Sequence, residues 1–76
     1  MEEFFAYIVK NLVDQPDAVE VRCSQSDRGI VVEVRVDAND VGKVVGRQGR
    51  TIEALRTIAS TIGARLGHRL RLEVVQ

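Results

Sequence analysis

Apolar residues recur at helical spacing near both ends of the chain. From Glu2 to Val13 two acids occupy the first turn, and the pattern predicts a helix with one buried stripe. That stripe consists of Phe4, Phe5, Ile8, Val9, Leu12 and Val13. Pro16 ends the helix because proline cannot continue the hydrogen-bond ladder. A second, longer amphipathic helix is predicted from Arg50 to Leu66, with Gly67 as its left-handed cap. Its apolar positions are Ile52, Leu55, Ile58, Ala59, Ile62 and Leu66.

A third, short helix is predicted over residues 38–45. Its apolar edge consists of Val41, Val44 and Val45. Asp37 is placed to cap the first turn, and Asp40, three residues on, to complete a box-like arrangement. Gly42 costs about 1 kcal/mol relative to alanine in a helix interior. This glycine is therefore either tolerated or lets something approach the helix.

Three stretches alternate apolar and polar residues with a period of two, as strands with one wet face do. They cover residues 18–24, 30–37 and 69–75, and a polar turn over 25–29 indicates a hairpin or a wider connection. The order is helix, strand, strand, helix, helix, strand. Because each strand is apolar on one face only, all three helices should cover the same face of a three-stranded sheet. We expect a single α+β two-layer domain over residues 1–76.

The formal net charge of +0 conceals an asymmetry. Residues 1–40 hold four bases against nine acids, a balance of −5, and residues 41–76 hold seven bases against two acids, a balance of +5. Such a split favours a polyanionic partner that meets one face of the protein. The plainer alternative is that both faces are merely solvated.

Several classes of protein are disfavoured by what the chain lacks. One cysteine cannot form an internal disulfide, and the N-terminal apolar run has neither the basic start nor the length of a signal peptide, so we expect a cytoplasmic protein. Cys23 fits a small buried hydrophobe, and His68 has no second ligand beside it. No phosphate-binding G-x-x-x-x-G-K run and no serine beside a base is present. We expect no metal, no cofactor and no enzymatic activity.

The run Gly46-Arg47-Gln48-Gly49 lies between the second and third predicted helices. Neither glycine has a Cβ, so backbone amides in this turn can approach an anion closely. Arg47 offers a fork of N–H donors suited to phosphate, and Gln48 adds a donor and an acceptor. The start of the following helix also favours anions. The sequence therefore predicts a phosphate site, with a turn that uses glycine for geometry alone as the alternative.

This loop and its flanks resemble the signature of the KH domain, in which a hydrophobic pair precedes G-x-x-G and an isoleucine follows. Residues 44–52 read Val-Val-Gly-Arg-Gln-Gly-Arg-Thr-Ile, with Leu55 one turn later. The element order is similar to the type II KH fold of bacterial proteins, and the resemblance covers essentially the whole chain. It implies single-stranded RNA binding, a homodimer, and pairing with a second KH protein of the KhpB (Jag) kind. It also implies a global post-transcriptional regulator or RNA chaperone linked to cell envelope growth and division.

The resemblance implies a site by position. Loop residues would clamp about four nucleotides, two basic flanking residues would attract RNA, and aliphatic side chains would floor a groove with help from the strand over 30–36. The predicted site residues are Lys43, Gly46, Arg47, Gln48, Gly49, Arg50, Val41, Val44, Val45 and Ile52. We expect at least half of the four aliphatic residues to be core as well. With no aromatic residue there to stack on bases, binding should be weak and salt-sensitive.

Two functions therefore remain from the sequence. The first is an RNA-binding module that acts through the loop. The second is a protein-interaction or dimerisation module that pairs with another KH protein, with RNA binding secondary.

Overall fold

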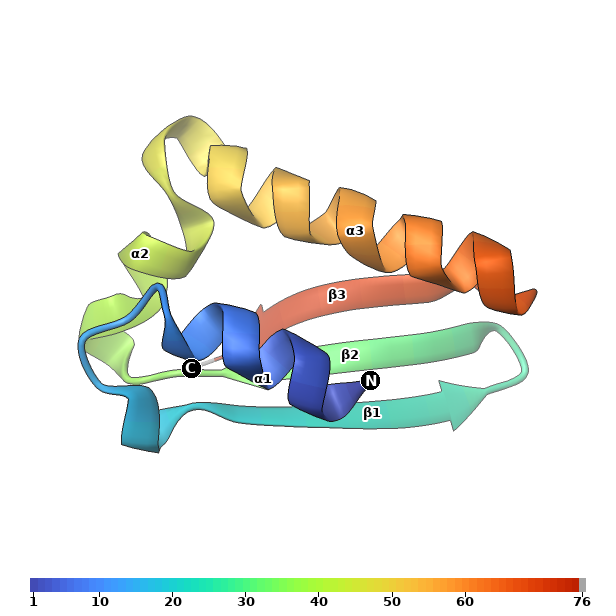
Figure 1. Ribbon diagram of the computed structural model, residues 1–76, viewed down its shortest axis with the longest axis horizontal. Coiled ribbons are helices and arrows are strands. Elements are labelled where there is room, and N and C mark those ends of the chain that lie inside the picture. The colour runs from blue at the N-terminus through green and yellow to red at the C-terminus, as the bar shows by residue number, and fades with distance from the viewer. Residues whose placement is uncertain (76) are drawn as a thin grey trace.

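The computed structural model describes residues 1–75. Within this range the chain forms three α-helices and three β-strands in the predicted order (Figure 1). The helices are α1 (Glu2–Lys10), α2 (Val41–Val45) and α3 (Arg50–Leu66), and the strands are β1 (Glu20–Ser26), β2 (Gly29–Arg35) and β3 (Leu70–Val75). Single 3-10 turns lie at Pro16–Ala18, Ala38–Asp40 and Arg47–Gly49.

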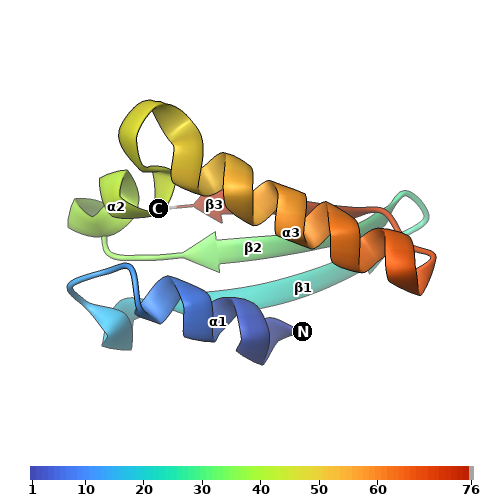
Figure 2. The ribbon, with the colours of Figure 1, turned by 45° about the horizontal axis from the view of Figure 1, so that its top comes forward.

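The sheet is mixed and has the order β1-β2-β3. β1 and β2 form an antiparallel hairpin in which Ser26 pairs with Gly29, so the connection is tight rather than wide. β2 and β3 run parallel, with Ile30 opposite Leu70. A parallel pair needs a crossover, and α2, the glycine loop and α3 provide it. The loop therefore lies at one end of the molecule, beside the ends of β2 and β3 (Figure 2).

The helices cover one face of the sheet, which confirms the two-layer α+β prediction (Figure 2). α1 packs beside β1 and α3 beside β3. Between the layers lies one apolar core, composed of Phe5, Val9, Val19, Val32, Val34, Val36, Val44, Ile52, Leu55, Ala59, Leu70 and Leu72. The strand residues in this core alternate with exposed or half-buried neighbours, as the period of two requires.

Both long helices bury a narrower stripe than their sequences predict. Phe4 in α1 is 46% exposed, and Ile58 and Leu66 in α3 are 36% and 55% exposed. α1 packs mainly on β1, and α3 packs on β3 and α2, and these contacts leave apolar side chains at the margin of each stripe exposed to solvent. α1 also ends at Lys10 instead of Val13, because Asn11 caps it by donating a side-chain hydrogen bond to the Tyr7 carbonyl at 2.7 Å.

The turn that leads into α2 matches one half of the predicted capping arrangement. Asp37 accepts a hydrogen bond from the Asn39 backbone N–H at 2.9 Å, as an N-cap should. Asp40 does not complete a box, so that prediction is wrong. Its carboxylate is 1% exposed and accepts from the Gln15 backbone N–H at 2.9 Å. Asp40 instead ties the α1–β1 connection to the start of α2.

Candidate nucleic-acid interface

The loop between α2 and α3 reverses the chain through three residues with positive φ. Gly46 has φ 79° and ψ 173°, and Gly49 has φ 74° and ψ 14°. Between them, Gln48 has φ 57° and ψ 26°, and it is the only non-glycine residue with positive φ in the part of the chain that the structure describes. This left-handed conformation costs a non-glycine residue about 1–2 kcal/mol. Strain of this kind at an exposed loop tip favours a functional role.

Glycine is suited to positions 46 and 49 for different structural reasons. A Cβ on Gly46 would overlap Oγ1 of Thr51 and lie 2.9 Å from the Thr51 backbone nitrogen. The missing side chain thus lets the first turn of α3 pack against the loop. A Cβ on Gly49 would have Ile52 Cγ2 at 3.9 Å as its nearest neighbour. Gly49 therefore has space beside it, whereas Gly46 is packed against Thr51.

The backbone amides of the loop fall into two pairs. The Gly46 N–H donates to the Gly42 carbonyl at 2.9 Å, and the Gly49 N–H donates to the Gly46 carbonyl at 3.1 Å. The N–H groups of Arg47 and Gln48 donate to no acceptor within residues 1–75. Two successive free amides in a turn form a concave nest that suits an anion. The free donors therefore belong to the two middle residues and not to the glycines.

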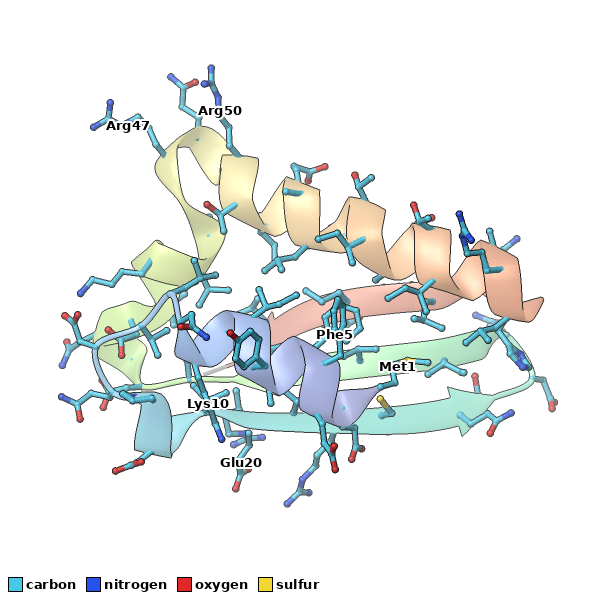
Figure 3. The ribbon with its side chains drawn as sticks, viewed as in Figure 1. Met1, Phe5, Lys10, Glu20, Arg47 and Arg50 are labelled. Carbon is cyan, nitrogen blue, oxygen red and sulfur yellow. The ribbon has the colours of Figure 1, made fainter. Side chains whose placement is uncertain are left out.

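Positive charge surrounds this pair of amides. Arg47 and Arg50 project from the loop and from the start of α3, away from the sheet (Figure 3). Both side chains are exposed, and neither has a carboxylate within 4.0 Å in the described chain. The exposed Gln48 side chain lies between them in sequence. An extended anion at the loop would meet two guanidinium groups whose charge is not already balanced.

The Lys43 side chain was predicted to attract RNA, but in the structure it is paired with acids. Its ammonium forms a hydrogen-bonded ion pair with Asp14 and lies 3.8 Å from Oδ1 of Asp40. The hydrogen bond with Asp14 raises the pKa of Lys43 above its usual 10.5. The charge of Lys43 is thus balanced by acids on the α1–β1 connection and at the start of α2.

The four aliphatic residues of the predicted site fall into two pairs. Val44 and Ile52 lie in the core, while Val41 and Val45 are half-buried. The expectation that half of the set is core is confirmed. In β2, residues 32 and 34 are likewise buried, so the strand contributes to the core. Of the four, Val41 and Val45 keep apolar surface that a ligand can touch, and Ile30 and Val31 at the start of β2 are half-buried as well.

A groove that the sequence did not indicate runs between α3 and β3. It has a volume of about 580 Å³, and Arg56, Ser60 and the strand residues 70–74 line it. Arg56 pairs with Glu53 at 3.1 Å, and Arg71 pairs with Glu73 at 3.0 Å. The groove exists because β3 is an edge strand, and strand order cannot be derived from residue periodicity.

Other candidate chemistry is sparse in the described residues. Between positions 1 and 75 no group of three His, Cys, Asp or Glu side chains is placed to hold a metal ion. Burial, with a smaller contribution from the charge of Glu2, raises the pKa of the half-buried Cys23 thiol above 9.0. None of the helices described is both long enough and apolar enough to cross a membrane.

The element order, the parallel β2–β3 pair and the Gly-x-x-Gly loop between two helices define a KH domain of type II. The chain belongs to the KhpA/KhpB family of KH domains, whose family model matches residues 2–74. This family consists of RNA-binding proteins and not enzymes, in agreement with the expectation from the sequence.

Relatives from distant bacteria cover almost the entire chain. RNA-binding protein KhpA of Chlamydia pneumoniae is 42% identical over 76 residues, which is 100% of this chain and 97% of that protein. KhpA of Streptomyces coelicolor is 51% identical over 65 residues, 86% of this chain and 82% of the relative. KhpA of Aquifex aeolicus is 40% identical over 76 residues, 100% of this chain and 96% of the relative. The similarity therefore extends over the whole domain and is not confined to the loop.

Proposed function

We propose that this protein binds single-stranded RNA and holds the phosphates of about four nucleotides at its glycine loop. The observation that carries the proposal is the pair of adjacent N–H groups on Arg47 and Gln48, which no acceptor within residues 1–75 occupies. Arg47 and Arg50 provide unbalanced positive charge beside them. The name shared by its relatives, RNA-binding protein KhpA, supports RNA as the polyanion.

A chain ligand fits this surface better than a single nucleotide. The loop is open on the outside of the molecule, and the α3–β3 groove offers room for further nucleotides along α3. Next to the loop, a Cβ on Gly42 would meet nothing within 4 Å, so a ligand can come close to the α2 backbone. The aromatic residues Phe4, Phe5 and Tyr7 all lie in α1. Without aromatic stacking at the loop, we expect weak binding with modest sequence preference.

The test replaces Arg47 and Gln48 by aspartate and measures binding of a fluorescent single-stranded RNA by anisotropy at moderate salt. We expect affinity to fall by about tenfold or more, because like charges placed together at an interface cost several kcal/mol. Ala64→Glu combined with Arg65→Glu is the matched control, because it makes the same charge change on exposed residues at the far end of α3. Unchanged RNA affinity in the loop variant, with a native circular dichroism spectrum, would contradict the proposal.

Large apolar side chains exposed to solvent favour a second function, which is pairing with another KH domain. The exposed large apolar residues are Met1, Phe4, Tyr7, Ile58 and Leu66, all on or next to α1 and α3. We propose that this α1/α3 surface is buried in a homodimer or in a complex with a KhpB (Jag)-like protein. Two linked loops would bind RNA more tightly through avidity. A cytoplasmic role in post-transcriptional regulation or as an RNA chaperone, linked to the cell envelope, is proposed from the family resemblance alone.

A further inference from the structure

Lys43 lies close to the loop but its ammonium is engaged by carboxylates. It is in α2, three residues before Gly46, and its side chain is 44% exposed. The ammonium pairs with Asp14, whose side chain is 71% exposed, and lies 3.8 Å from the buried Asp40. The contact with Asp14 is thus a surface ion pair next to the proposed RNA site.

The position of Asp14 is fixed by its neighbour in the chain. The backbone N–H of Gln15 donates to Oδ2 of Asp40 at 2.9 Å, and this carboxylate is almost completely buried. The α1–β1 connection is therefore held against the start of α2. Asp14 stays within reach of Lys43 even though its own side chain is exposed.

We propose that Asp14 is a positioning residue that keeps Lys43 from RNA and so lowers the affinity of the loop for the phosphate chain. The inference rests on the proposed RNA-binding function. Gly46 follows Lys43 by three positions, about 4.5 Å along the helix axis, and lysine carries its charge on a flexible four-carbon stem. An ammonium released from Asp14 can therefore reach a phosphate at the loop. In the native protein, RNA must compete with Asp14 for that contact.

The test compares Asp14→Asn with Asp17→Asn in anisotropy titrations of single-stranded RNA over a range of salt concentrations. Asp17 is an exposed acid of the same connection and has no ion pair within the described chain. We expect Asp14→Asn to raise affinity about two- to fivefold at low salt, the range set by an exposed ion pair. One added phosphate contact should also steepen the slope of log K against log salt by about 0.7. Asp17→Asn should leave the slope unchanged.

Lys43→Gln completes the test in both backgrounds. We expect it to lower RNA affinity more in the Asp14→Asn protein than in the native protein and to abolish the gain that Asp14→Asn produces. Asp14→Ala, which lacks a hydrogen-bonding amide, should behave like Asp14→Asn, and circular dichroism should show the native fold in each variant. Equal effects of Asp14→Asn and Asp17→Asn, or a gain that survives Lys43→Gln, would overturn the inference. A failure of the proposed RNA-binding function would give a different result, because the native protein itself would then not bind RNA.

Discussion

Gly46 and Gly49 illustrate how one residue type answers two structural needs. Gly46 has no room for a side chain because Thr51 packs against it, whereas Gly49 has space around it and needs glycine only for its positive φ. The spacing of the two glycines is visible in the sequence. The different surroundings of the two glycines cannot be read from the sequence, because they depend on how the first turn of α3 packs against the loop.

At the residue scale, alanine substitutions should separate these two roles. Gly49→Ala should lower the free energy of unfolding by about 1–2 kcal/mol, the cost of a left-handed alanine. Gly46→Ala should lower it further, by about 1–3 kcal/mol for a backbone conformation that essentially only glycine adopts plus about 1–3 kcal/mol because the new Cβ overlaps Thr51. Urea denaturation of both variants provides the measurement. Equal losses would mean that the close packing of Thr51 on Gly46 is not present in solution.

At the scale of elements, two helical glycines also differ in what surrounds them. In α2, Gly42 faces open space, and in α3, Gly63 lies where the helix approaches β3. A Cβ on Gly63 would lie 2.5 Å from the His68 carbonyl oxygen and 3.1 Å from Leu70 Cβ. The short turn from α3 into β3 is thus possible only because the helix has a glycine there.

Alanine should therefore act in opposite directions at the two positions. Gly42→Ala should raise the free energy of unfolding by about 0.5–1 kcal/mol, because it reduces the entropy lost on folding without a clash. Gly63→Ala should lower it by about 1–3 kcal/mol, because backbone atoms cannot move aside easily. Thermal and urea unfolding of both variants show whether each substitution raises or lowers the free energy of unfolding. A stabilised Gly63→Ala protein would contradict the observed packing of α3 on β3.

We also expect Gly42→Ala to weaken RNA binding despite its greater stability.

At the scale of the whole molecule, the periodicity of the chain is enough to predict both layers of the fold. Polar and apolar alternation places the strands, and the spacing of Gly46 and Gly49 marks the loop. The burial of Asp40 and the pairing of Lys43 with Asp14 could not be predicted, because they join positions 25 and 29 residues apart in the sequence. The exposure of Ile58 could not be predicted either, since periodicity marks an apolar stripe but not how much of it the sheet covers.

The exposure of Ile58 leads to a prediction about assembly. Ile58→Glu should weaken self-association, because a charge would enter the apolar α1/α3 surface, while the exposed position of the side chain leaves the fold intact. Thr57→Glu places the same charge one residue earlier, at another exposed position of α3, and should have little effect. Sedimentation velocity over a range of protein concentrations measures both. The α1/α3 surface would not be the dimer interface if the native protein stayed monomeric at every concentration, or if Ile58→Glu left the dimer unchanged.

The proposed RNA site depends on two backbone amides at the tip of the loop. A titration of ¹⁵N-labelled protein with a single-stranded RNA tetranucleotide, followed by amide NMR spectra, tests them directly. We expect the largest shifts at the N–H groups of Arg47 and Gln48, with the Cys23 amide unmoved because it already donates to Glu2 at 2.8 Å. RNA binding that leaves the Arg47 and Gln48 amides unchanged would contradict the proposed site.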